Sequence, residues 1–178
     1  MKLKYDLQEV DWKCFYLPGL SFFLGDKTAS RPEEEAAAER LPQEAVSLIK
    51  EYEGLRLNAY RDGPNRWAIG YGTESFEGET ITHREAERRL LRELGPLNLL
   101  ISSRCVLCNR GQKSALLSFA FNVGRGALLR SRLWRLTLEG NYVTAADEFR
   151  RWTYHNGKHY RGLALRREAE RAVYLMGD

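Results

Sequence analysis

The sequence predicts an α+β domain that is mainly α-helical and carries a small β-hairpin near its start. Two observations predict this class. Helix start and stop signals recur from residue 41 onward, with apolar residues at helical spacing between them. The turn-forming segment Asp62-Gly63-Pro64-Asn65 separates two short stretches, 55–60 and 66–72, that have strand character. Several short helices combined with one hairpin are typical of the α+β class.

The first predicted helix begins at Pro42 and ends just before Gly54. Proline is favoured in the first turn of a helix, and glycine is favoured directly after its last turn. Val46, Ile49 and Glu53 recur at helical spacing, so we expect them to share one face of this helix. The hairpin follows directly in the chain.

Polar cap residues predict further helices after the hairpin. Thr82 and Glu85 form a capping-box pattern that opens one helix, which Gly95-Pro96 is expected to break. Asn109 and Gln112 open a second helix. The remaining expected features are a turn over 97–101, a helix end at Asn122-Val123-Gly124, helices over 128–138, 143–152 and 165–175, and a turn at Asn156-Gly157.

Residues 1–40 differ in pattern from the rest, so we expect an N-terminal extension of unknown role ahead of a domain over 41–178. Residues 14–25 are apolar, but Pro18-Gly19 interrupts them and the run falls short of the roughly 18 residues that cross a membrane. A basic start favours a signal peptide, whereas three acidic residues before position 12 argue against it. We expect secretion only if residues 1–30 act as a signal.

The net charge of +4 lies in the C-terminal half, where residues 102–178 carry 14 Lys and Arg against 6 Asp and Glu. This charge attracts nucleic acid, anionic lipid or a bacterial wall polymer alike. No basic run with interleaved aromatics and no helix-turn-helix punctuation is present, so we expect no nucleic-acid partner. Cys105 and Cys108 form a lone CxxC without further ligands, so we expect inert thiols, no metal and no cofactor.

Glu53 and Asp62 are the candidate catalytic pair. Glu53 lies in the last turn of its helix, where the helix dipole and apolar neighbours such as Leu55 disfavour the ionised carboxylate, as a general acid requires. Asp62 follows in the hairpin turn, where it should stay ionised. A helix end and an adjacent turn can hold two carboxylates across a cleft, as glycoside hydrolysis needs. On spacing alone, a solvated helix end and an ordinary turn are the commoner explanation of the pair.

The segments around the pair carry a resemblance. The sequences EGLRLNAYRD at 53–62 and AIGYGT at 68–73 strongly resemble the active-site segment of bacteriophage-type lysozymes, glycoside hydrolase family 24. The resemblance continues through SFAFNVG at 118–124 and GLALRREAER at 162–171, and spans about residues 42–176. It implies a lysozyme-like fold, in which a small hairpin lobe and a helical lobe flank a cleft. It also implies cleavage of the β-1,4 bond between N-acetylmuramic acid and N-acetylglucosamine in peptidoglycan.

The resemblance also implies roles for individual residues. Glu53 would protonate the leaving oxygen, and Asp62 would orient or activate water, with the two carboxyl groups roughly 6.5–9.5 Å apart in an inverting enzyme. The chain departs from the family at Ala68, where a Thr commonly helps to hold that water. Thr73 is a nearby candidate for this task, although the family often has His there. The candidates for substrate binding are Arg56, Tyr60 and Trp67, and either Arg166 or Arg167 is a candidate to lie near Glu53 and tune the site, with a solvated basic face as the alternative.

Three function classes follow from these observations. The leading one is a muramidase that lyses the bacterial wall. The second is a non-catalytic peptidoglycan-binding protein on the same fold, weakened by Ala68, and the third is a membrane-active or nucleic-acid-binding basic protein. We expect a monomer without stable membrane insertion. The resemblance implies accumulation in the host cytoplasm before lysis and a holin-type partner that opens the membrane.

Overall fold

The structure, a computed structural model, describes residues 41–177 and confirms the mainly α-helical α+β class. The helices are α2 (Gln43–Glu53), α3 (His83–Arg104), α4 (Arg110–Val123), α5 (Arg125–Arg130), α6 (Arg132–Leu138), α7 (Tyr142–Glu148), the short 3₁₀ helix η3 (Phe149–Arg151) and α8 (Arg161–Leu175). The strands are β1 (Arg56–Arg61), β2 (Trp67–Gly70), β3 (Thr73–Ser75), β4 (Tyr154–His155) and β5 (Lys158–His159).

Strands β1, β2 and β3 form an antiparallel sheet in chain order. The expected strand over 66–72 is shorter than predicted, and the third strand was not predicted. The reason is a tight reversal after β2, where Gly70 (φ 66°) and Gly72 (φ 96°) adopt conformations that L side chains rarely adopt. The chain folds back at these glycines, so that Thr73 pairs with Ile69.

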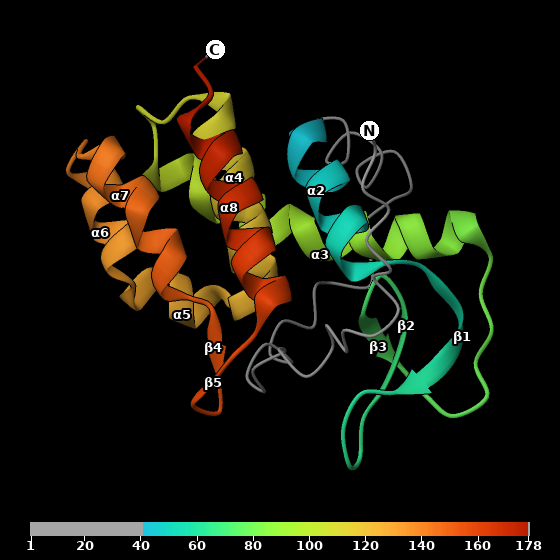
Figure 1. Ribbon diagram of the computed structural model, residues 1–178. Helices are drawn as coiled ribbons and strands as arrows, with labels where there is room; N and C mark the ends of the chain where they lie inside the picture. The colour runs from blue at the N-terminus through green and yellow to red at the C-terminus, as the bar shows by residue number, and fades with distance from the viewer. Residues whose placement is uncertain (1–40, 178) are drawn as a thin grey trace, which may run out of the picture.

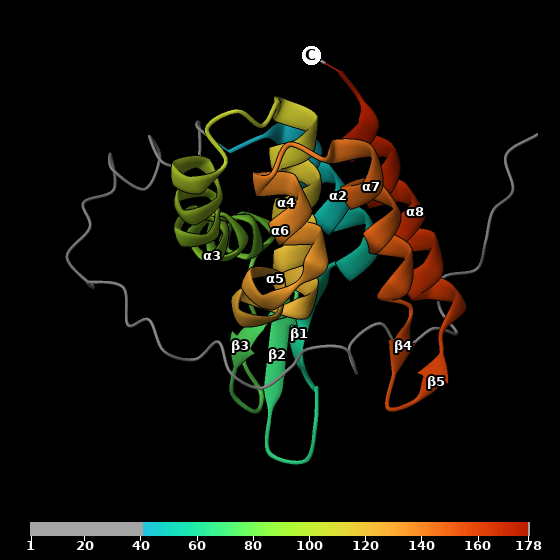
Figure 2. The same ribbon diagram turned by 90° about the vertical axis from the view of Figure 1, so that its left-hand side faces the viewer.

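The helical part of the molecule is built around α4, whose residues from Gln112 to Val123 are almost all buried. Helices α2, α3 and α8 pack against it (Figures 1 and 2). Phe119 of α4 meets Phe149 and Trp152 edge-on, with ring centroids 5.4 and 5.2 Å apart. This packing places α8 beside both α4 and α2, which matters for the site below.

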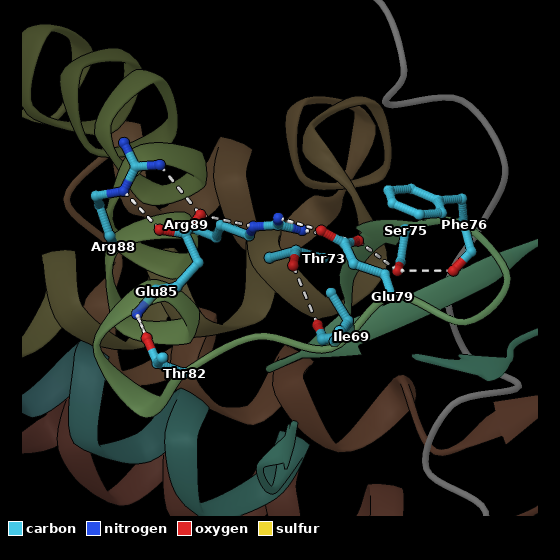
Figure 3. A network of polar contacts seen from close by, with 9 residues as sticks. All are labelled: Ile69, Thr73, Ser75, Phe76, Glu79, Thr82, Glu85, Arg88 and Arg89. Carbon is cyan, nitrogen blue, oxygen red and sulfur yellow. Dashed lines mark hydrogen bonds and ion pairs between the residues drawn. The ribbon is translucent and has the colours of Figure 1, made fainter. Parts of the chain in front are cut away.

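Helix α3 connects the sheet to the helical part. It contacts β2 and β3 as well as α4, and Figure 1 shows it running from the sheet towards the other helices. One ion pair fastens its first turns to the sheet side, between Arg89 and Glu79, which follows β3 and also accepts a hydrogen bond from Ser75 (Figure 3). Arg89 also pairs with Glu85 within α3. The sheet is therefore held against the helix by a charge pair as well as by apolar packing.

The predicted break at Gly95-Pro96 was wrong, because α3 continues through Pro96 to Arg104. A proline inside a helix costs about 3 kcal/mol. Buried apolar side chains lie on both sides of it along one face of α3, and each contributes roughly 1.5–3 kcal/mol, so burial outweighs the cost. These side chains are Leu90, Leu94, Leu97 and Ile101.

Three further helix predictions need correction. The segment 128–138 divides into α5 and α6 at Ser131, whose hydroxyl accepts a hydrogen bond from the Trp134 amide at 3.0 Å and so caps α6. The segment 143–152 divides into α7 and η3, while the last helix begins at Arg161 rather than at 165. The turn at Asn156-Gly157 links β4 and β5, as predicted.

The two capping-box predictions had different outcomes. Asn109 and Gln112 form the complete box at the start of α4. Thr82 caps α3 by accepting from the Glu85 amide, but the Glu85 carboxylate binds Arg88 and Arg89 instead of returning to Thr82 (Figure 3). The nearby cations compete for this carboxylate. The expectations for residues 1–40 lie outside the described residues, and within 41–177 no helix has the length and apolarity to span a bilayer.

Candidate active site

Glu53 is the last residue of α2, and Gly54 ends the helix with φ 66°. The Gly54 amide donates to the Lys50 carbonyl at 3.1 Å, which closes the final turn. The Glu53 side chain is only 12% exposed, so its carboxylate lies largely out of water at the negative end of the helix dipole.

The two carboxylate oxygens of Glu53 have different surroundings. Oε1 accepts a hydrogen bond from Arg166 Nη1 at 2.7 Å. Oε2 lies towards the β2–β3 turn, where a Cβ added to Gly72 would approach it to 3.7 Å. Apolar neighbours were expected around Glu53, but α8 brings a guanidinium to it instead. Arg166 therefore binds one oxygen of Glu53, and the other oxygen, Oε2, faces the sheet.

Arg166 or Arg167 was expected either to lie near Glu53 or to belong to a solvated basic face. The structure supports the first alternative, because Arg166 is 1% exposed and reaches Glu53 across 113 residues of sequence. Burial lowers the pKa of Arg166, but the charges of Glu53 and Glu170 outweigh burial and raise it overall. Arg166 therefore stays charged beside Glu53.

Asp62 follows β1 directly and lies at the mouth of the first hairpin turn. Its amide donates to the Arg66 carbonyl at 2.9 Å, and its side chain is 5% exposed. Arg66 Nε lies 3.6 Å from Asp62 Oδ2, so a cation stands beside the carboxylate.

Tyr60 links the two carboxylates electrostatically. Burial raises the pKa of the Tyr60 phenol, and the negative charges of Asp62 and Glu53 raise it further. Both carboxylates therefore lie close enough to act on one ring, although they come from different elements. Arg56 covers that ring, with its guanidinium carbon 4.7 Å from the ring centroid.

The remaining predicted residues lie on the sheet. Trp67 is half-buried beneath Arg61. Ala68 is fully buried and pairs with Tyr60 and Glu74. Its methyl side chain offers no hydrogen bond to a water. Thr73 is buried, and its hydroxyl donates to the Ile69 carbonyl at 3.0 Å (Figure 3). The Thr73 proton is thus used inside the sheet, which leaves only lone pairs for a water.

Glu93 of α3 is a carboxyl group near the site that sequence reasoning missed. Burial raises its pKa to about 7, while the charges of Arg92 and Arg66 lower it and those of Glu53 and Glu74 raise it. A signal was available in the sequence. Glu93 lies three residues after Leu90 and seven after Ala86, on the apolar face of α3.

Metal ligands and thiols form no part of this site. Within residues 41–177, no three His, Cys, Asp or Glu side chains are grouped so as to hold a metal ion. Cys105 and Cys108 are buried free cysteines at the turn between α3 and α4. Their thiols share a hydrogen bond, which raises the pKa of Cys105 and lowers that of Cys108.

Comparison with known proteins identifies the family. The family model described as phage lysozyme matches residues 50–170, which include the Glu53 and Asp62 segment and most of α8. The chain belongs to the phage lysozyme family. This confirms the resemblance on which the fold and the carboxylate roles were predicted.

The phage lysozyme chain is similar to curated endolysins. It is 38% identical to the endolysin of Bacillus phage B103 over 148 residues, 78% of this chain and 55% of that protein. It is 36% identical over 141 residues to the endolysin of Acyrthosiphon pisum secondary endosymbiont phage 1, covering 75% of this chain and 97% of that protein. The chain therefore spans about half the length of the Bacillus phage relative and nearly all of the second.

A solved structure supports the same family. The muramidase domain of SpmX from Asticaccaulis excentricus superposes with a TM-score of 0.66 at 34% identity, covering 75% of this chain and 95% of that one. This similarity confirms the lysozyme-like fold expected from the sequence.

Proposed function

We propose that this phage lysozyme is a muramidase, which cleaves the β-1,4 bond between N-acetylmuramic acid and N-acetylglucosamine and so lyses the bacterial cell wall. The observation that carries the proposal is the pair of largely buried carboxylates, Glu53 at a helix end and Asp62 at a hairpin turn, whose charges both raise the pKa of the Tyr60 phenol. The similarity to endolysins and to a muramidase domain supports it.

In the proposed mechanism, Glu53 is the general acid. Because Oε1 accepts from Arg166, the proton is carried on Oε2 and passes to the leaving glycosidic oxygen. Asp62 takes the proton of the attacking water on the opposite face of the sugar, with inversion at the anomeric carbon. Since Ala68 has no hydroxyl, Asp62 supplies the side-chain acceptor that holds this water.

The direct test is hydrolysis of purified peptidoglycan, followed by release of reducing ends and loss of turbidity. We expect Glu53→Gln to lose about 100-fold or more in rate while it keeps the fold, because Gln cannot donate a proton to the leaving oxygen. Glu51→Gln is the matched control, since Glu51 is exposed on the same helix. Wild-type rates in the Glu53 variant, with a folded circular dichroism spectrum, would contradict the proposal.

The second candidate function is non-catalytic binding of peptidoglycan, and Ala68 is the observation that favours it. If the absent hydroxyl stops turnover, the native chain sediments with insoluble peptidoglycan but releases no reducing ends. Ala68→Thr then restores hydrolysis. Hydrolysis by the native chain excludes this function, whatever the rate of the Ala68 variant.

We also propose that the protein acts as a monomer on the cell wall and reaches it from the host cytoplasm through a lesion made by a holin-type partner. Sedimentation at several concentrations tests the monomer. Expression in a bacterial host with and without a membrane-permeabilising agent tests the route, and lysis without the agent would contradict it.

A further inference from the structure

A line of alternating buried charges runs inward from Glu53. Arg166 Nη1 lies 2.7 Å from Glu53 Oε1, and Arg166 Nε lies 3.1 Å from Glu170 Oε1. The next member is Arg167, whose Nε lies 2.9 Å from Glu170 Oε2. The last three side chains are at most 2% exposed. The line contains two acids and two guanidiniums, so it is neutral when all four are ionised.

Helix α4 fixes this line from the opposite side. The Ser118 hydroxyl donates to Glu170 Oε1 at 2.8 Å, while the Ser118 carbonyl accepts from Arg166 Nη2 at 3.3 Å. Asn122 Oδ1 accepts from Arg167 Nη2 at 2.9 Å. The guanidinium of Arg166 is therefore held in three directions, by Glu53, Glu170 and the α4 backbone, and has little freedom to rotate.

Such a line is a poor source of stability. Burying charged groups costs several kcal/mol per ion, and well-packed apolar side chains are often as stable or more stable. Burial lowers the pKa of Arg167 to about 10. Its Nη1 atom has no hydrogen-bond acceptor within residues 41–177, which adds to the cost. A role for the line is found at its outer end, where Arg166 Nη1 is fixed against Glu53 Oε1.

We propose that Glu170 and Arg167 are positioning residues for the acid, which act on Glu53 through Arg166. Glu170 orients Arg166 so that it occupies Oε1 and leaves Oε2 to carry the proton. Glu170 also offsets the positive charge of Arg166, so that Glu53 can be protonated beside a guanidinium, and Arg167 balances Glu170 in turn. The inference rests on the proposed function in so far as Glu53 is the acid.

Several charged or titratable groups act on Glu53 and affect whether its carboxyl group is protonated. These groups are Arg166 and Arg167 from α8, Tyr60 from β1 and Glu93 from α3, with Glu170 acting through Arg166. Removing the negative charge of Glu170 leaves an excess of positive charge, which favours ionised Glu53. Removing the positive charge of Arg167 leaves an excess of negative charge and favours the protonated acid.

The test is therefore the pH dependence of kcat on purified peptidoglycan for two variants of opposite sign. We expect the alkaline limb to move down by roughly one pH unit in Glu170→Gln and up by a similar amount in Arg167→Gln. In Glu170→Gln, kcat falls at the wild-type optimum because less Glu53 is protonated there, and KM stays the same in both variants. Glu168→Gln and Arg171→Gln are the matched controls, because both residues form more exposed ion pairs on α8, with Arg150 and Asp147. Their profiles should match the wild type.

A second readout needs no activity. Glu53→Gln, Glu170→Gln and the double variant form a cycle on the free energy of unfolding. Coupling through Arg166 makes the double loss larger than the sum of the single losses, because both of its partners are then neutral. If the wild type proves inactive, the proposed function fails, and this cycle still decides whether Glu170 and Glu53 are coupled.

Ser118→Ala covers the case in which the charge variants do not fold. It removes one donor to Glu170 and no charge, so we expect kcat to fall several-fold at constant KM. The proposal is overturned if the two charge variants move the alkaline limb in the same direction or leave it in place. It is also overturned if the unfolding losses add, or if Ser118→Ala turns over at the wild-type rate.

Discussion

Glu93 illustrates how one residue can make the stability of this domain depend on pH. Its carboxyl group lies on the buried face of α3, and burial raises its pKa from 4.5 to about 7. Between these two values the folded state binds a proton that the unfolded state has released. The free energy of unfolding therefore falls as the pH rises through this range, and stays lowered above it.

We predict that Glu93→Gln is more stable than the wild type at pH 8, by at most about 3 kcal/mol. At pH 4 the two proteins should be nearly equal, because a protonated Glu resembles Gln. Urea unfolding at the two pH values measures the difference. Glu77→Gln, at an exposed loop position, should change neither value. Equal stability of the Glu93 variant and the wild type at pH 8 would contradict this, because it would mean that ionising Glu93 does not lower the free energy of unfolding.

At the scale of elements, α3 shows local preference and burial in conflict. Pro96 and the glycine before it predict a helix end, and the structure has a continuous helix of 22 residues. Pro96 is exposed, whereas the neighbouring apolar stripe faces the core. The helix therefore keeps a residue that weakens its backbone.

We predict that Pro96→Ala raises the free energy of unfolding by about 1–3 kcal/mol, because alanine restores an amide donor and removes the steric clash of the ring. Thermal and urea unfolding give the value. Leu99→Ala is the control, since Leu99 is 71% exposed on the same helix and should have little effect. A loss of stability in Pro96→Ala would mean that the core requires the local geometry that proline imposes.

The elements that sequence reasoning predicted well are those specified by neighbouring residues. Asn109 and Gln112 satisfy each other across three positions, and Gly54 ends α2 by its own conformation. The elements it predicted poorly depend on distant parts of the chain. The extent of α3 depends on the core it covers, and Glu85 binds cations rather than closing its capping box.

The whole molecule assembles the candidate site from α2, β1, the β2–β3 turn and α8. Glu53 and Asp62 could be predicted because nine residues and a local motif connect them. For Arg166, a position near Glu53 and a position on a solvated basic face were both open. Glu170 was missed, because α8 resembles a solvated charged helix in sequence. Their position on the same face as Leu163 and Tyr174, which are buried, was the available signal.

The most direct measurement for the account is mass spectrometry of the products released from purified peptidoglycan by the wild type and by Glu53→Gln. We expect fragments that end in reducing N-acetylmuramic acid from the wild type and almost none from the folded variant. Fragments that end in reducing N-acetylglucosamine, released peptides, or equal products from the two proteins would contradict it.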